Sequence, residues 1–287
     1  MKRPALGLRI ALAASFSAAL LAPSVRAEEV VRSYTVSARA GVRVDTDDGS
    51  VRVTASDSNR VEFRVEYKGY VLDKDLSLQS RQDGNTVELT TRVSGQSGIS
   101  WGRDPRSVRI EVRMPLNADL QVTTGDGSVK AESLTGRVDL RTEDGSITAD
   151  KLKGDIRLRT EDGAIDARAL DGKVDAESGD GRVRLAGRFE ALRVKTGDGS
   201  VDAQALPGSQ MTSGWDIETG DGSVRLALPV GFQADLDATT DDGRITLGLP
   251  VTVEGRSSGS QVHGRINGGG QPLSIHTGDG SIRLGKS

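Results

Sequence analysis

The sequence predicts an all-β protein, and within that class a parallel β-helix, or β-solenoid, with about 18 residues per coil. The first observation behind this prediction is a repeat with a fixed period. An Asp-Gly pair returns at one constant interval at Asp126, Asp144, Asp162, Asp180 and Asp198. Further pairs stand, at looser intervals, at Asp48, Asp221, Asp242 and Asp279. A short constant period is typical of stacked repeat architectures.

The second observation is the pattern around each Asp-Gly pair. A small hydroxyl residue stands two positions before each Asp: Thr46, Thr124, Thr142, Thr160, Ser178, Thr196, Thr219, Thr240 and Thr277. A β-branched aliphatic residue stands three positions after it: Val51, Val129, Ile147, Ile165, Val183, Val201, Val224, Ile245 and Ile282. Apolar and polar residues alternate on both sides, which predicts a strand, a turn and a second strand.

The competing interpretation is an antiparallel meander, because Asp-Gly between alternating strands is also a strong hairpin signal. The hydroxyl and the aliphatic residue are five positions apart, so both face the core only if a corner lies between them. A coil as long as the repeat also stacks each residue type on its own copy, which a meander does not require. The apolar positions do not share a six-residue phase, which disfavours a three-sided helix of hexapeptides. The handedness is left open, although right-handed crossovers are the usual form.

Residues 1–27 have the features of a secretory signal peptide. Lys2, Arg3 and Arg9 precede an apolar run over 10–21, and the small residues near Ala27 offer a cleavage site. Cleavage there leaves a mature chain that begins at Glu28. We therefore expect an exported protein that is periplasmic, on the cell surface or secreted.

Composition excludes several classes of function. Without the leader, 34 Lys and Arg stand against 41 Asp and Glu, a formal net charge of −7, which argues against nucleic acid as a partner. There is no Cys, so no disulfide framework is expected. No later run approaches the roughly 20 apolar residues of a membrane span. Aromatic residues make up only 3% of the chain, which fits a thin aliphatic core.

Residues 28–121 are expected to form an N-terminal β portion with antiparallel capping strands. Only one Asp-Gly pair with the flanking residues of the repeat lies here, at Asp48, while 61–67, 87–90 and 108–112 alternate as longer strands. The segment 94–106 is predicted to be a loop. A cap is needed because the terminal coil of a solenoid otherwise exposes an unpaired edge.

Residues 122–287 are expected to form the solenoid repeat region, in one continuous domain with the preceding portion. Its regular part, 122–206, has a second corner with a Leu-Xaa-Gly pattern that begins at Leu134, Leu152 and Leu170. The fourth unit departs from this pattern at 187–189, where we expect a kink. Beyond Gln204 the units lengthen, and a turn over 257–264 is expected to replace the one missing between Asp242 and Asp279.

These motifs resemble the bacterial putative adhesin family, which comprises exported β-strand-repeat domains of unknown function. The resemblance rests on the Thr-Xaa-Asp-Gly-Ser-Val/Ile repeats, the Pro-containing segments 114–120 and 228–236, and the closing stretch 266–282. It covers roughly 33–284, and its motifs are repetitive and only moderately specific. It implies a β-helix associated with the cell surface and with envelope-stress systems, and it supplies no catalytic residues.

The turn carboxylates are interpreted first as turn formers. Stacked Asp residues about 4.8 Å apart repel by roughly 0.9 kcal/mol in water, which a solvated corner tolerates. A calcium ladder is the sharper alternative, since calcium binds several carboxylate and carbonyl oxygens. The Gly-Gly-Xaa-Gly-Xaa-Asp pattern of calcium-binding rolls is absent, however.

Catalysis finds little support in the sequence. Ser128, Ser146, Ser200, Ser223 and Ser281 follow turns, but the chain has only two His residues. These two, His263 and His276, are expected on the surface. A polysaccharide lyase or glycosidase needs carboxylates at one distinctive place, whereas Glu143-Asp144 and Glu161-Asp162 arise from the repeat. We therefore predict no catalytic, cofactor-binding or metal-binding residues.

The outward strand positions carry charges of both signs. The set consists of Arg137, Arg141, Arg157, Arg159, Lys173, Arg193, Asp139, Asp155, Asp166, Asp175 and Glu177. Neighbouring coils are expected to join them in cross-strand ion pairs. The sequence therefore predicts a non-enzymatic, adhesin-like binding or structural scaffold at the cell envelope, with an unidentified envelope protein or glycan as partner. A polysaccharide-acting β-helix enzyme and a calcium-dependent adhesive module are the alternatives.

Overall fold

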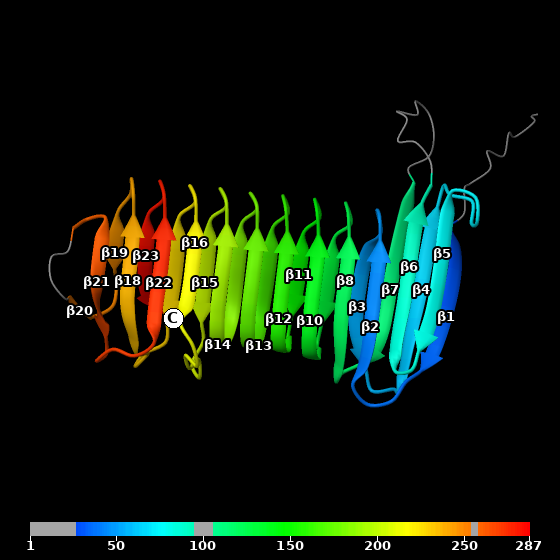
Figure 1. Cartoon of the computed structure of the whole chain (residues 1–287), viewed down its shortest axis with the longest axis horizontal. Helices are drawn as coiled ribbons and strands as arrows, with labels where there is room; N and C mark the ends of the chain where they lie inside the picture. The colour runs from blue at the N-terminus through cyan, green and yellow to red at the C-terminus, as the bar shows by residue number, and fades with distance from the viewer. Residues whose placement is uncertain (1–26, 95–105, 254–257) are drawn as a thin grey trace, which may run out of the picture.

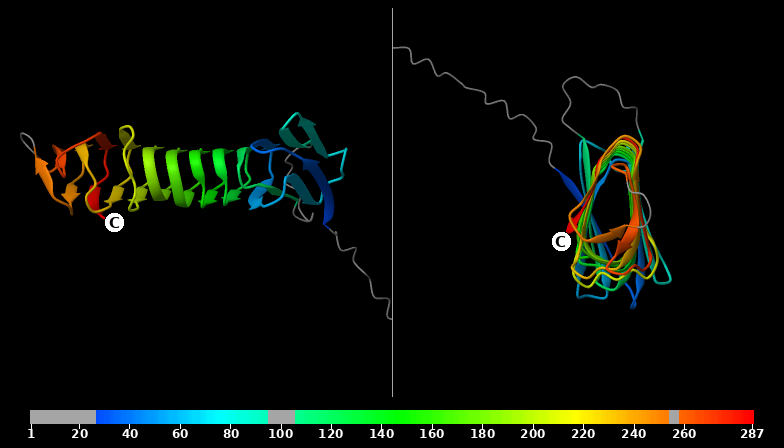
Figure 2. Two further views of the ribbon diagram at one scale, coloured as in Figure 1. Left: turned by 90° about the horizontal axis from the view of Figure 1, so that it is seen from below. Right: turned by 90° about the vertical axis from the view of Figure 1, so that its left-hand side faces the viewer.

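The computed structural model describes residues 27–94, 106–253 and 258–287, and every regular element in these ranges is a β-strand. The strands, β1 to β23, lie side by side in an elongated stack (Figure 1). Seen along its long axis, the stack has two walls that converge at a narrow edge (Figure 2). The prediction of an all-β chain is confirmed.

The first wall is made mostly of strands that end at the narrow edge, and its antiparallel strands β5 and β21 run the opposite way. In spatial order its strands are β5 (Leu76–Asp83), β6 (Thr86–Val93), β2 (Ala40–Thr46), β8 (Ala118–Thr124), β10 (Thr135–Thr142), β12 (Lys153–Thr160), the second parts of β13 (Ile165–Ser178) and β14 (Val183–Thr196), β16 (Trp215–Thr219), β22 (Pro272–Thr277), β18 (Ala234–Thr240), β21 (Gln261–Ile266) and β20 (Val251–Val253).

The second wall lies opposite and is made of strands that mostly begin just after the narrow edge. In the same spatial order they are β1 (Glu28–Thr35), β4 (Arg60–Lys68), β7 (Ser107–Pro115), β3 (Ser50–Ser56), β9 (Val129–Glu132), β11 (Ile147–Asp150), the first parts of β13 and β14, β15 (Val201–Ala205), β17 (Val224–Leu228), β23 (Ile282–Lys286) and β19 (Ile245–Leu247). Strands β13 and β14 contribute to both walls and join them.

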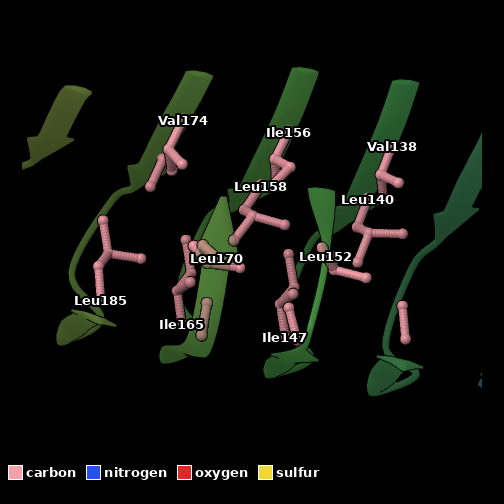
Figure 3. Close-up of a cluster of buried hydrophobic side chains, with 14 of the residues drawn as sticks. Val138, Leu140, Ile147, Leu152, Ile156, Leu158, Ile165, Leu170, Val174 and Leu185 are labelled. Carbon is pink, nitrogen blue, oxygen red and sulfur yellow. The ribbon is translucent and has the colours of Figure 1, made fainter. Parts of the chain in front are cut away.

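Neighbouring strands in the middle of the stack are parallel, and equivalent residues lie beside one another. Val138 of β10 pairs with Leu120 on one side and with Ile156 on the other, so each step along the wall is one period of the sequence repeat. The side chains at these positions form aliphatic ladders inside the stack (Figure 3). Val138 and Ile156 are both essentially inaccessible to solvent. The narrow core is thus filled by side chains that repeat from coil to coil.

The hydroxyl residue before each Asp-Gly turn is buried and joins adjacent coils. The backbone N–H of Gly163 donates to the Thr160 hydroxyl at 3.0 Å. That hydroxyl lies 3.0 Å from the carbonyl oxygen of Gly145 and 3.1 Å from that of Glu143, and donates its single hydrogen to one of them. Ser178 repeats the arrangement with Gly163 and Gly181 at 3.0 Å each. Both the hydroxyl and the aliphatic residue five positions later face inward, as the predicted corner requires.

In the repeated Asp-Gly turns other than the one at Asp48, the glycine is required by close packing between coils. A Cβ on Gly163 would collide with the carbonyl oxygen of Gly145 in the next coil, and a Cβ on Gly145 would meet Gly127 in the same way. The backbone N–H of Glu161 donates to the Glu143 carbonyl at 2.9 Å across the same corner. No larger residue fits there without moving the backbone of the neighbouring coil.

The order of the coils in space differs from their order in the chain at the C-terminal end. The last two strands, β22 and β23, lie between the β16–β17 coil and the β18–β19 coil. The segment that closes the chain is therefore paired on both sides (Figure 1). Strand β21 then runs antiparallel to β18.

The N-terminal end has the same kind of insertion. Strands β2 and β3 lie between the β8–β9 coil and the pair β6 and β7. The pairs β1–β4, β4–β7 and β5–β6 are antiparallel.

Three local predictions differ in outcome. The irregularity expected at 187–189 is present as a change of register and not as a break in the strand. Strand β14 runs unbroken through these residues, and its pairing with β13 shifts register between Ala167 and Leu170 and again between Gly172 and Lys173. The turn predicted over 257–264 is right for 258–260, which bend outside any strand, and wrong for 261–264, which belongs to β21 and extends to pair with β18. Most of the predicted leader 1–27 and of the loop 94–106, and residue 257, lie outside the described residues.

We predict that Gly163→Ala destabilises the protein, because the added methyl group must displace the backbone of the adjacent coil. The expected loss of unfolding free energy is about 1–3 kcal/mol, measured by urea denaturation. Gly285→Ala is the matched control, since nothing lies within 4 Å of a Cβ at that position. An equal effect of both substitutions would contradict the close-packing explanation.

We also predict that Thr160→Val destabilises the protein, although valine keeps the shape of threonine. The substitution leaves the buried N–H of Gly163 without its acceptor, which costs about 1–3 kcal/mol. Thr160→Ser restores the hydroxyl and is expected to recover most of the loss, as Ser178 already serves in this role. Equal unfolding midpoints for Thr160→Val and the natural chain would show that the hydroxyl contributes nothing.

Candidate functional site

The Asp residues of the nine turns lie along the narrow edge, and all nine are exposed. At Asp48 burial raises the carboxyl pKa, and the nearby carboxylates of Asp126 and Asp47 raise it further. Within the described ranges, no group of three or more His, Cys, Asp or Glu side chains is arranged to hold a metal ion. The edge is thus a line of solvated turn carboxylates.

The two histidines lie on the first wall near the C-terminal end. His263 Nδ1 is 3.0 Å from an Asp237 carboxylate oxygen, and its Nε2 is 2.9 Å from Gln261 Nε2. His276 is exposed and stands in register with Glu218. In the described part of the chain no serine hydroxyl hydrogen-bonds to either ring, so the structure does not bring the turn serines and the histidines together.

The outward positions singled out in the sequence gather on the first wall, with the exception of Asp166. Asp139, Arg157, Asp175, Arg193 and Asp216 occupy the same register position in five successive strands, from β10 to β16. Their charges alternate in sign along the stack. A neighbouring row repeats the alternation with Arg137, Asp155 and Lys173.

Only some of these side chains form ion pairs with one another. Arg159 lies 3.3 Å from both Asp175 and Glu177. On the second wall, Asp166 pairs with Arg168 at 3.0 Å and with Arg184 at 3.2 Å, and the Arg168 hydrogen bond in particular lowers the pKa of the Asp166 carboxyl. The expected cross-strand pairs are therefore present in part. The outward groups of Arg157 and Arg193 make no ion pair within the described residues and remain available to a ligand.

An open groove of about 610 Å³ lies over these two rows of alternating charges. Its lining includes Arg157, Asp175 and Arg193 of the wall, together with Ser213 and Gly214. The groove lies beside the irregular segment 206–214, which precedes β16. It offers guanidinium donors and carboxylate acceptors in alternation along an extended path, as a polar chain-like ligand requires.

Sequence reasoning missed Ser213, Gly214 and Asp216 as part of this groove. The available signal was the interval from Asp198 to Asp221, which exceeds the constant interval of the preceding turns. The extra residues form the irregular segment 206–214, so a lengthened interval marked the place where the regular wall is modified.

A second hollow of about 780 Å³ lies where chain segments 207–211 and 229–233 meet the C-terminus, and no Asp, Glu, Lys or Arg lines it. Val230 at its rim is 86% exposed.

The described residues contain no helix long and apolar enough to cross a membrane.

Three solved structures illustrate what the chain is similar to. A putative adhesin from Bacteroides fragilis is 11% identical, with 90% of this chain and 97% of that chain covered and a TM-score of 0.38. A putative adhesin from Parabacteroides merdae is 9% identical, with 90% and 96% covered and a TM-score of 0.40. A putative lipid binding protein from Parabacteroides distasonis is 13% identical, with 89% and 96% covered and a TM-score of 0.43.

No curated protein matches the chain. The model of the Toastrack DUF4097 family matches residues 40–285, which is most of the sequence. This match confirms the resemblance to a family of repeat domains of unknown function. The chain belongs to the Toastrack DUF4097 family.

Proposed function

We propose that the protein is a non-enzymatic, exported scaffold at the cell envelope that binds an extended polar partner, a glycan or an envelope protein. The observation that carries the proposal is the row of alternating charges on the first wall. Asp139, Arg157, Asp175, Arg193 and Asp216 are held at a constant strand spacing of about 4.8 Å. A rigid, evenly spaced row suits a partner that is itself extended and periodic.

The proposed scaffold is a parallel β-helix with about 18 residues per coil. It is formed by residues 122–287 and is continuous with an N-terminal β portion over 28–121. The constant offset between equivalent residues of β8, β10 and β12 supports the coil length. The antiparallel strands β1, β4, β5 and β6 support a cap at the N-terminal end. A long rigid body of this kind displays its outward side chains without a conformational change on binding.

The charged groups of the groove favour binding over turnover. Arg157 and Arg193 are exposed, and the carboxylates of the groove alternate with basic groups instead of facing each other as an acid and base pair.

Export is proposed from the leader-like composition of residues 1–27. Expression of the full chain in a Gram-negative host is expected to give an envelope or medium fraction whose N-terminal residue is Glu28, identified by intact mass and N-terminal sequencing. A variant with Lys2, Arg3 and Arg9 replaced by Glu is the control and should stay in the cytoplasm uncleaved. Uncleaved natural chain in the cytoplasm would contradict the export proposal.

Binding is tested by retention of envelope glycans and proteins on the immobilised protein, together with a glycan array. Arg157→Gln combined with Arg193→Gln is expected to weaken binding of the retained partner about tenfold, because each exposed guanidinium can make a charge-assisted hydrogen bond. The control is Arg52→Gln combined with Arg113→Gln, two exposed residues of the second wall.

A retained partner that binds both double variants equally would remove the groove from the proposal. The array glycans are also incubated with the protein and assayed for new reducing ends and for unsaturated sugar products. Turnover that disappears in the groove variant would replace the scaffold with the polysaccharide-acting enzyme.

A further inference from the structure

Four arginines and three serines surround a hollow of about 360 Å³ on the second wall, away from the groove described above. The hollow is lined by Arg182, Arg184, Arg225, Arg283, Ser200, Ser223 and Ser281, and by the single carboxylate of Asp202. Because the whole chain carries a net charge of −3, such a concentration of arginine is a local departure from its composition.

The protein neutralises these arginines only in part. Arg225 is 3.3 Å from Asp202, and Arg184 shares Asp166 with Arg168. Among the described residues Arg182 donates only to the Ser200 hydroxyl, at 3.2 Å. For Arg283 no ion pair is present in the same ranges. The hollow therefore keeps a surplus of positive charge.

Two of these arginines are placed directly opposite each other. The register of β15, β17 and β23 aligns Asp202, Arg225 and Arg283 in one row, and Arg184 of β14 precedes them. Like charges directly opposite on neighbouring strands are destabilising, and an anion bound between them reverses that effect.

The serines occupy a second row beside the arginines. Ser200, Ser223 and Ser281 each follow an Asp-Gly turn and stand at the same position in three adjacent coils. A hydroxyl both donates and accepts hydrogen bonds, so this row suits the hydroxyl groups of a sugar chain. Together the rows offer positive charge and neutral hydrogen-bonding groups about 4.8 Å apart along the stack.

The residues on either side of the hollow determine how a bound polymer is oriented relative to the long axis of the stack. Asp198, Asp221 and Asp279 of the narrow edge border the serine row on one side, two positions earlier in the sequence. On the other side the next outward row is uncharged, with Gln204 and Ala227 in register. An anionic polymer is therefore repelled from the edge and guided parallel to the long axis of the stack.

We propose that this hollow, which we name the Arg–Ser surface, binds a linear anionic polysaccharide whose carboxylate or sulfate groups pair with the arginines. Nucleic acid is disfavoured because the acidic edge lies alongside, and no aromatic side chain for base stacking lines the hollow. The proposal specifies a ligand class for an exported scaffold. It concerns a surface separate from the alternating-charge groove, so a failure of one binding proposal does not contradict the other.

The test is titration calorimetry of the purified protein at low salt with polygalacturonate, dextran sulfate, neutral dextran and inorganic phosphate. We expect at least one anionic polymer to bind, with affinity that falls as salt is added, and neutral dextran to give no heat. A preference for polygalacturonate or for dextran sulfate identifies the anionic group as carboxylate or sulfate.

The decisive variant is Arg225→Gln combined with Arg283→Gln, which is expected to weaken polymer binding at least about tenfold. Arg52→Gln combined with Arg113→Gln, elsewhere on the second wall, removes the same charge and should change the affinity less than about twofold. Thermal unfolding of both variants checks that the fold is unchanged, as expected for exposed residues.

The proposal is overturned if no anionic polymer binds, if both double variants bind the polymer equally, if neutral dextran binds as well as the charged polymers, or if inorganic phosphate alone binds. Sedimentation velocity is measured in parallel. If the natural chain self-associates and Arg225→Gln with Arg283→Gln abolishes this, the occupant is the acidic edge of a second copy, which also overturns the polysaccharide proposal. None of these results bears on the binding role proposed for the groove on the first wall.

Discussion

The stack depends on the contact between successive corners at its narrow edge. There a buried hydroxyl, as in Thr160, accepts the N–H of its own turn and donates to the backbone of the adjacent coil. The glycine of the turn allows the two backbones to approach this closely. Any insertion within the corner would move the hydroxyl away from the neighbouring carbonyl oxygen. The period is therefore constrained here more strictly than anywhere else in the coil.

Because the constraint is local and repeats, much of the fold could be predicted from the sequence. The buried Thr142, the inward Val138 and Ile147, and the corner between them follow from one repeat unit and its copies. The spatial order at the two ends could not be predicted in this way. A repeat identifies which segments form coils, but any coil can stack on any other coil with the same ladders. The insertion of β22 and β23 between earlier coils depends on long-range pairing that a periodic sequence leaves degenerate.

The candidate sites were predicted less completely than the core, for a physical reason. Inward positions are restricted to residues that fill a narrow interior, whereas outward positions such as Arg157 and Arg225 are exposed, so packing does not determine their residue type. Their grouping depends on which strands become neighbours. Arg225 and Arg283 are far apart in the sequence, and only the insertion of β23 beside β17 aligns them.

The core also changes where the period fails. Phe189, Trp215 and Phe232 pack together near the lengthened units, with ring centroids 5.9 Å apart for Phe189 and Trp215 and 4.9 Å apart for Trp215 and Phe232. Trp215 Nε1 is buried without a hydrogen-bond partner among the described residues, which costs about 1–3 kcal/mol. Elsewhere the ladders satisfy their buried polar groups by repetition, so the irregular coil lacks that compensation. The same irregular coil borders the groove on the first wall, and the coils that follow it carry Arg225 and Arg283. The lengthened units therefore weaken the regular packing of the core. They also make one part of an otherwise uniform surface different from the rest.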